Sequence, residues 1–281
     1  MHIQWFPGHM TKSLRMMEES VKGVDAIGYV LDSRAPFSCF NPAFERYTEK
    51  KPCVFLLNKS DLADFETTER WIEYFSSRGG NAVALNANEK GCAKLIERAF
   101  ASLEMKNVER LRQRGVARPV RIMIIGVPNS GKSSIINLLS GRKNAITGNK
   151  PGVTKGKQWI RLSDGMELLD TPGTLWSKFE DQNVAQNLFF IGSISDNVVD
   201  RQEGGLNLLD RLKVVAPDVL IKRYGLSEDD LRDGELLDKI CLKRGCILKG
   251  EPDRERCAAA LIDDFRKGRL GRISLEAPED L

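Results

Sequence analysis

Residues 126–133 have the types and spacing that bind a phosphate chain. Their sequence, Gly-Val-Pro-Asn-Ser-Gly-Lys-Ser, fits the pattern G-x-x-x-x-G-K-[ST] and lies between a strand-like and a helix-like stretch. Glycines let backbone N–H groups curl around phosphate oxygens, Lys132 can reach the β- and γ-phosphates, and the Ser133 hydroxyl can ligate Mg²⁺. The pattern predicts a nucleoside triphosphate site whose contacts come from Pro128, Asn129, Ser130, Gly131, Lys132, Ser133 and Ser134.

A second motif, Asp-Thr-Pro-Gly at 170–173, follows an apolar pair. A carboxylate at a strand end beside a phosphate loop can hold Mg²⁺ through water, and the Gly173 N–H can contact a γ-phosphate. Thr154 stands between the two motifs and can complete the Mg²⁺ shell when triphosphate is bound. We therefore expect Ser133, Thr154 and Asp170 at the metal, with Lys132 and Thr154 also acting in catalysis.

The base-recognition signal lies earlier in the chain. Asn-Lys-Ser-Asp at 58–61 matches the Asn-Lys-x-Asp signature of guanine binding. Asp61 can accept hydrogen bonds from guanine N1–H and the exocyclic amine, and adenine would leave a buried Asp61 unpaired. Asn58 can tie this loop to the phosphate loop, and the Lys59 stem can cover the base. At Asn86-Ala87 a backbone N–H can meet guanine O6, although a serine more usually occupies the position of Asn86.

To come together, these motifs require a sheet whose strands have their carboxyl ends along one edge. Continuous apolar runs at 26–32, 53–57, 82–85 and 120–127 alternate with helix-like segments at 67–75, 92–103 and 132–139. Such runs indicate a buried, mostly parallel sheet with helices on both faces, an α/β P-loop fold. After about residue 180 the strand signals stop, which predicts a GTPase domain over 1–180 and a smaller all-α domain over 181–281. In that domain, Ser227 is expected to cap a helix that ends near Gly245.

The order of the motifs is unusual. In most GTPases the phosphate loop comes first and the guanine loop last, whereas here the guanine loops at 58–61 and 86–87 precede the phosphate loop. All parts are present in a circularly permuted order, and the charged segment 104–119 joins the old end of the fold to its old beginning. The Mg²⁺ and γ-phosphate loops then feed directly into the helical domain, which could relay nucleotide state there.

Together with this order, three short pieces resemble the YlqF/RbgA family of ribosome-biogenesis GTPases over essentially the whole chain. They are Trp-Phe-Pro-Gly-His-Met at 5–10, Asp-Ser-Arg-Ala-Pro at 32–36 and Asn41-Pro42. The resemblance implies a cytoplasmic GTPase that assists assembly of the large ribosomal subunit, with a helical RNA-binding C-terminal domain. Its implied partners are guanine nucleotide, GTP or GDP, and the large-subunit precursor with its rRNA.

The sequence shows no obvious side chain to orient the water molecule that attacks GTP. Many GTPases place a glutamine directly after the Asp-x-x-Gly motif, and Thr174 stands there instead. His9 is one candidate to orient water, and its alternative roles are capping a helix or contacting RNA. Asn129 suggests a K⁺ site that takes the place of an arginine finger, and its alternative is a turn-forming asparagine. We expect slow hydrolysis until a ribosomal particle stimulates it.

Composition limits the remaining classes. With 281 residues, 41% hydrophobic and 29% charged, the chain fits one or two globular domains. No apolar run reaches the length of a membrane helix. The six scattered cysteines form no Cys-x-x-Cys pair, so we expect no structural zinc site. Because the N-terminus also has no secretion pattern, we expect the protein in a reducing cytosol. We expect a monomer without a membrane partner.

Positive charge concentrates at the junction of the permutation. The formal charge is +4, and segment 104–123 alone carries net +4, from six basic and two acidic residues. This segment is either a solvated helix face or a phosphate-backbone contact. The C-terminal part offers a second set with the same two interpretations: Lys243, Arg244, Arg266, Lys267, Arg269 and Arg272. The alternative function is a nucleotide-gated protein-binding switch in which hydrolysis is incidental; an ATP-using enzyme is disfavoured by Asp61.

Overall fold

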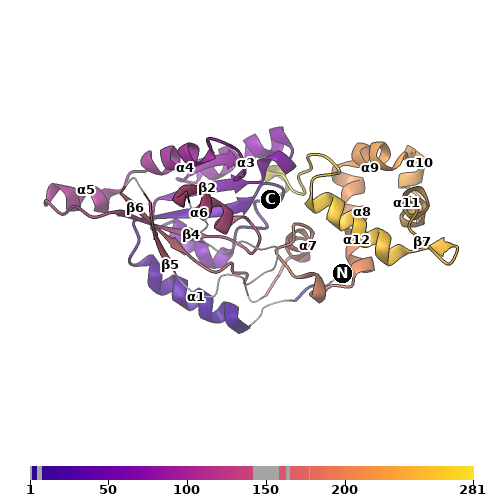
Figure 1. Cartoon of the computed structure of the whole chain (residues 1–281), viewed down its shortest axis with the longest axis horizontal. Helices are drawn as coiled ribbons and strands as arrows, with labels where there is room; N and C mark the ends of the chain where they lie inside the picture. Colours follow the sequence, from indigo (N-terminus) through magenta and orange to yellow (C-terminus); the bar gives the residue numbers. More distant parts are fainter. Residues whose placement is uncertain (1, 5–7, 142–157, 163–164, 177) are drawn as a thin grey trace.

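The computed structural model describes residues 2–4, 8–141, 158–162, 165–176 and 178–281, except for the side chains of His9 and Gln158. Its centre is a six-stranded sheet in the order β3-β2-β1-β4-β6-β5 (Figure 1). All neighbouring pairs are parallel except β5 with β6, which is antiparallel. The strands are β1 (Ala26–Asp32), β2 (Cys53–Asn58), β3 (Asn81–Leu85), β4 (Val120–Ile125), β5 (Gln158–Arg161) and β6 (Met166–Asp170).

Helices cover both faces of this sheet, as the sequence predicts. On β1, the side chains of Ile27, Tyr29 and Leu31 belong to one buried cluster, and those of Ala26 and Val30 belong to the other. Strands buried on both faces explain the continuous apolar runs. The helices of this part are α1 (Gly8–Val21), α2 (Glu45–Thr48), α3 (Phe65–Ser77), α4 (Cys92–Ala101), α5 (Lys106–Gln113) and α6 (Lys132–Ser140), with 3-10 turns at Pro42–Phe44 and Ser60–Leu62.

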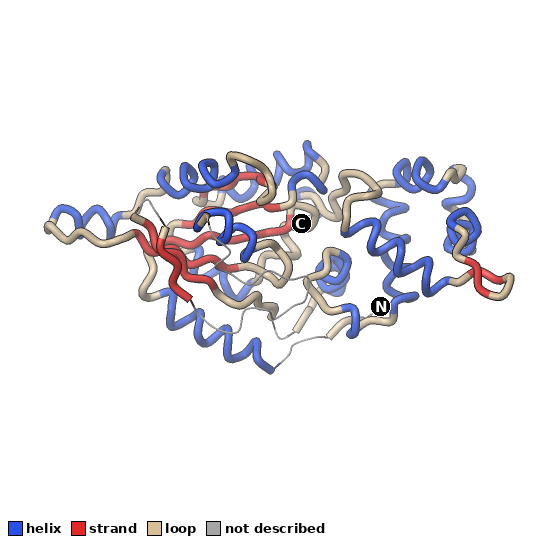
Figure 2. The backbone as a smooth tube through the Cα atoms, in the orientation of Figure 1, coloured by secondary structure: helices blue, strands red, loops and turns tan. Residues whose placement is uncertain are grey.

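The C-terminal part is mainly helical and lies beside one end of the sheet (Figure 2). A Cβ built on Gly205 of α8 would lie 2.3 Å from the Cβ of Ala258 on α12, so glycine permits the close crossing of these two helices. The helices are α7 (Gln182–Phe190), α8 (Arg201–Val215), α9 (Pro217–Tyr224), α10 (Glu228–Leu231), α11 (Leu236–Arg244) and α12 (Arg254–Arg266), with 3-10 turns at Asp196–Val198 and Pro278–Asp280.

Two expectations for this part need correction. The strands do not stop at residue 180, because β7 (Ile247–Leu248) and β8 (Glu251–Pro252) pair as a short antiparallel hairpin. The helix expected from Ser227 to about Gly245 is two helices. Ser227 begins α10 through a capping box with Asp230, and that helix ends after one turn before α11 begins. The expectation of an all-α C-terminal domain is therefore correct for its helices but omits the hairpin of β7 and β8.

The last residues return to the sheet-containing part. Ile273 N–H donates to Leu62 O at 2.9 Å, and Leu275 N–H donates to Arg34 O at 2.8 Å. The buried carboxylate of Glu276 accepts from the Ser38 hydroxyl at 2.6 Å and from Asn187 Nδ2 at 3.1 Å. One apolar cluster consequently contains side chains from both parts, and the boundary at 180/181 stays a prediction.

Candidate functional site

The centre of the sheet creates the binding edge. Strands β1 and β4 are parallel neighbours, and the chain continues outward from them in opposite directions, through β2 and β3 on one side and through β6 on the other. In open α/β sheets, ligands bind at the carboxyl ends of the strands at such a switch point. Asp32, Asn58, Asp170 and the loop 126–131 all lie at or directly after these strand ends.

The phosphate loop has the backbone conformation that its glycines allow. Gly126 and Gly131 have φ values of 150° and 101°, and α6 begins directly afterwards at Lys132. A Cβ on Gly131 would lie 2.0 Å from Asn58 Nδ2, and one on Gly126 would lie 2.3 Å from Val30 O. Side chains at these positions would therefore push the loop away from both neighbours. We expect the N–H groups at the start of α6 to bind an anion.

Asn58 joins the three predicted nucleotide loops. Its side chain is buried at the end of β2, where Nδ2 donates to Ser130 O at 2.9 Å and Oδ1 accepts from Ala87 N–H at 3.1 Å. The link to the phosphate loop agrees with the sequence-based hypothesis. The Ala87 N–H is donated to Asn58 in this structure, so its predicted contact with guanine O6 would have to share or replace that bond. Asn86 accepts from Asn88 N–H at 3.0 Å.

Lys59 and Asp61 follow Asn58 in the same predicted guanine loop. Lys59 has a left-handed backbone with φ of 60°, and its ammonium group donates to Asn129 O at 2.7 Å and to Asp32 Oδ2 at 2.8 Å. Asp61, in the turn Ser60–Leu62, is exposed. The penalty for a wrong base therefore applies only once the base itself covers the Asp61 carboxylate.

Sequence reasoning missed a buried ion pair behind the guanine loop. Asp32 and Arg34 form a salt bridge at 2.8 Å, and both side chains are at most 2% exposed. Burial alone would raise the pKa of Asp32, but the charges of Arg34 and Lys59 hold that pKa well below its usual range. Arg34 also lies over the Phe265 ring at 5.1 Å. In the sequence, residues 32–36 drew attention only through their resemblance to the family.

Lys132 and Asp170 are buried groups of opposite charge, and each affects the pKa of the other. Lys132 is buried, and its ammonium group donates to Val127 O at 2.8 Å. Burial lowers the pKa of Lys132 to about 8. Burial also raises the pKa of Asp170, and the charge of Lys132 opposes that rise. Asp170 Oδ1 is buried without a hydrogen-bond partner among the described residues, which is the kind of acceptor that a cation site supplies.

Gly173 lies against the phosphate loop. A Cβ there would lie 2.8 Å from Pro128 Cα and 3.0 Å from Lys132 Nζ, so only glycine fits this approach. Thr174, at the position of the usual glutamine, is fully buried, and its hydroxyl donates to Met17 Sδ at 3.7 Å. Its side chain therefore faces α1. Thr154 lies outside the described residues; the backbone of His9 belongs to the first turn of α1, but its side chain also lies outside them.

Comparison with known proteins agrees with this geometry. A family model described as "50S ribosome-binding GTPase" matches residues 121–218. A protein named Ribosome biogenesis GTPase A from Bacillus cereus is 38% identical over 282 residues, covering 100% of this chain and 95% of that protein. The chain belongs to the ribosome biogenesis GTPase A family. A relative from Thermotoga maritima with the same name is 32% identical and covers 99% of this chain and 96% of its own length.

Solved structures of this GTPase family confirm the fold. GNP-bound YlqF from T. maritima superposes with a TM-score of 0.66 at 29% identity, covering 96% of this chain and 100% of that one. A GDP-bound YlqF structure gives a TM-score of 0.65. The YlqF/RbgA resemblance and the permuted α/β P-loop fold inferred from motif order are thereby confirmed. In this GTPase the predicted guanine loops follow β2 and β3, the predicted phosphate loop follows β4, and the 170–173 motif begins at the end of β6.

Most cations predicted to contact RNA in the C-terminal part of this GTPase have intramolecular partners. Arg244 and Arg269 pair with Asp264, Arg266 pairs with Asp196, and Lys267 pairs with Asp263, while Lys243 donates to Gly225 O. Arg272 is exposed. In the described part of the chain, no helix is both long and apolar enough to cross a membrane.

Proposed function

We propose that this chain binds GTP, hydrolyses it to GDP and phosphate, and acts as an assembly factor for the large ribosomal subunit. The observation that carries the proposal is the double hydrogen bond of Asn58, which joins both guanine loops to the phosphate loop at the switch point of the sheet. Membership of a GTPase family supports the reaction. In this proposal the nucleotide state governs docking on rRNA and release from it.

The proposed site divides the work among its residues. Backbone N–H groups of 128–134 hold the phosphates, Lys132 balances charge on the β- and γ-phosphates, and Asp61 selects guanine. The orphaned Asp170 Oδ1 and the Ser133 hydroxyl at the start of α6 fit Mg²⁺, with Thr154 as the third proposed ligand. When bound, the ion would neutralise charge that develops on the phosphates. Gly173 would bring its N–H toward the γ-phosphate.

The attacking water needs a ligand other than Thr174, whose hydroxyl faces Met17. We propose His9 for this role, because imidazole can orient or accept a proton from water near neutral pH. Comparison of GTP hydrolysis by wild type and His9→Ala, with and without ribosomal particles, tests this role. Equal stimulated rates would remove His9 from the mechanism.

The Asn129 side chain donates to Gly192 O at 2.7 Å, so a K⁺ ion at this position would require Asn129 to serve two partners. Hydrolysis measured in KCl and in NaCl at equal ionic strength tests K⁺.

The proposed RNA-facing surface is α5. This helix projects from the sheet-containing part, away from the C-terminal helices (Figure 1). Lys106, Arg110 and Arg112 of α5 and its C-cap residue Arg114 are exposed cations. By contrast, Arg118 pairs with Asp25 at 2.7 Å and Arg121 pairs with Glu167 at 3.3 Å. Among the described residues, the four exposed cations have no carboxylate partner. Unpaired exposed cations release counterions when they meet RNA phosphates.

Co-sedimentation with ribosomal subunits in GTP analogue, GDP and no nucleotide tests the proposal. We expect nucleotide-dependent binding to the large subunit and binding to naked rRNA that falls steeply with salt. Binding that ignores both nucleotide and salt would favour the alternative, a protein-binding switch. The matched pair of variants is Arg110→Gln/Arg112→Gln on α5 and Lys267→Gln/Arg269→Gln on the C-terminal part. Only the α5 variant should flatten the salt dependence.

We further propose that the protein works as a monomer in the cytoplasm. The six cysteines are all free and buried, which suits a reducing compartment. Sedimentation velocity across a tenfold concentration range tests the oligomeric state.

A further inference from the structure

The loop that follows α7 packs directly on the phosphate loop. The buried Ser193 hydroxyl donates to Pro128 O at 2.7 Å, and Asn129 Nδ2 donates to Gly192 O at 2.7 Å. Two consecutive residues of the phosphate loop are thus bonded to two consecutive residues of the C-terminal part. Asn129 has a left-handed backbone, with φ of 58°, so its side chain and backbone are both constrained.

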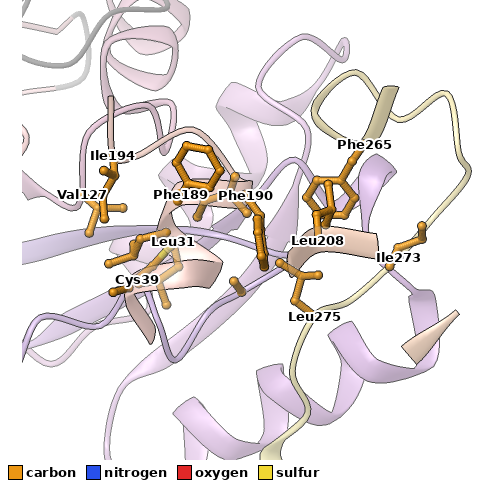
Figure 3. Packing of buried hydrophobic residues seen from close by; sticks show 14 of the residues in the cluster. Leu31, Cys39, Val127, Phe189, Phe190, Ile194, Leu208, Phe265, Ile273 and Leu275 are labelled. Atoms are coloured by element: carbon orange, nitrogen blue, oxygen red, sulfur yellow. The ribbon is translucent and has the colours of Figure 1, made fainter. Parts of the chain in front are cut away.

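Ser193 is itself held in place by α7. Its N–H donates to Leu188 O at 2.8 Å, and the N–H of Ile194 donates to the same carbonyl at 3.3 Å. Apolar packing reinforces these bonds, because Val127 of the phosphate loop and Ile194 lie next to each other in the buried cluster (Figure 3). A displacement of the phosphate loop would therefore move the end of α7 or break buried contacts.

Arg266 connects the same region to α12. Its guanidinium donates to Phe189 O at 2.6 Å and to Phe190 O at 3.0 Å, and it pairs with Asp196 at 2.8 Å. The two carbonyls belong to the last turn of α7, where helical carbonyls lack partners within the helix. Arg266 therefore fixes the end of α7, from which Gly192 and Ser193 reach the phosphate loop.

We propose that Ser193 is a positioning residue for the nucleotide site, and that its bond to Pro128 and the Asn129–Gly192 bond couple nucleotide occupancy to α12. The inference rests on the proposed function, because the loop that these bonds hold is the loop that would bind phosphates. Coupling between two sites is reciprocal. If the C-terminal contact orders the phosphate loop for nucleotide, then nucleotide must stabilise that contact by the same free energy.

Ser193→Ala tests the positioning role, with Ser38→Ala as the matched control. Ser38 is also a buried serine whose hydroxyl bonds across the two parts of the chain, to Glu276; in the described residues its hydroxyl has no hydrogen bond to the phosphate loop. We expect Ser193→Ala to weaken GDP binding about five- to tenfold, the value of one neutral hydrogen bond. Ser38→Ala should lower thermal stability and leave the Kd for GDP unchanged.

Hydrogen exchange gives a readout that a purely structural role would not move. In the wild type, GDP should slow amide exchange of Ser193, Ile194 and the end of α12. In Ser193→Ala saturated with GDP, the slowing at the end of α12 should be lost. Arg266→Lys keeps a charge for Asp196 but cannot reach both α7 carbonyls in the same fork, and it should also reduce the effect at α12.

The outcomes separate the two proposals. If the wild type binds GDP and Ser193→Ala binds it equally, the positioning role is overturned while the proposed function stands. If GDP slows exchange at α12 to the same degree in wild type, Ser193→Ala and Arg266→Lys, the coupling is overturned. If the wild type binds no guanine nucleotide, the proposed function fails and the inference fails with it.

Discussion

The side-chain amide of Asn58 donates to Ser130 O at 2.9 Å, while its oxygen accepts from Ala87 N–H at 3.1 Å. One buried side chain thus holds three loops that lie far apart in the sequence. The fit is close, since any side chain at Gly131 would overlap Asn58. We therefore expect nucleotide binding to depend on Asn58 even without a direct contact between Asn58 and the phosphates.

Asn58→Ala should weaken GDP binding by at least about tenfold and lower the free energy of unfolding by about 1–3 kcal/mol, because it leaves buried polar groups of both loops unpaired. Titration with GDP and urea denaturation measure the two effects. Asn81→Ala is the control: Asn81 Nδ2 donates to Ser102 Oγ at 2.8 Å, far along the sheet from the phosphate loop. It should affect stability alone. Unchanged GDP affinity in Asn58→Ala would contradict the linking role.

Nucleotide affinity should fall as the pH rises above 8. Burial lowers the pKa of Lys132 to about 8, so the free site loses its charge above that pH, whereas bound phosphates favour the ammonium form. Binding must then take up a proton, and affinity decreases by up to about tenfold per pH unit. Calorimetry at pH 8.5 in buffers of different ionisation enthalpy measures the uptake. Lys132→Arg, which stays charged, should show none of it.

The same shift predicts how stability changes with pH in the absence of nucleotide. The unfolded chain has the ordinary lysine pKa of 10.5 and therefore binds more protons than the folded protein between pH 8 and 10.5. The contribution of Lys132 to the free energy of unfolding should rise with pH in this window, by up to about 1.4 kcal/mol per unit. Comparison with Lys132→Met by urea denaturation isolates this contribution; identical pH dependence in both proteins would contradict it.

Asp61→Asn should remove the preference for guanine. The amide replaces one carboxylate oxygen with a donor, so it cannot accept from both N1–H and the exocyclic amine. We expect GDP affinity to drop at least about a hundredfold, as two charge-assisted bonds are affected. Xanthine carries a carbonyl in place of that amine and should bind the variant better than the wild type. Competition between GDP, XDP and ADP measures the change, and retained guanine selectivity would refute the assignment.

Thr174→Val should leave hydrolysis within about twofold of the wild type. The Thr174 hydroxyl is fully buried against Met17, and valine has nearly the same shape, so only one weak bond to sulfur is lost. Single-turnover hydrolysis with and without ribosomal particles measures the rate. A tenfold loss would show that Thr174 turns toward the nucleotide during the reaction.

The sequence by itself determined the fold class and was enough to predict the nucleotide loops. Continuous apolar runs that alternate with helical segments indicate a parallel sheet covered on both faces. The motifs require glycine, lysine and carboxylate at fixed spacings for reasons of local chemistry. Residues 58–61, 126–133 and 170–173 could therefore be predicted as nucleotide-binding loops without coordinates. The permutation followed from their order alone.

Only the tertiary structure showed the contacts between residues that lie far apart in the sequence. Arg266 and Arg244 read as available cations in the sequence, yet they pair with Asp196 and Asp264, which lie close only after folding. The side chain of Thr174 could face the nucleotide or the core, and packing against Met17 settled the direction. Ser193 carries no motif at all. Its proposed role rests on the contact between the end of α7 and the phosphate loop. A hydrogen bond between residues 65 positions apart leaves no local pattern in the chain.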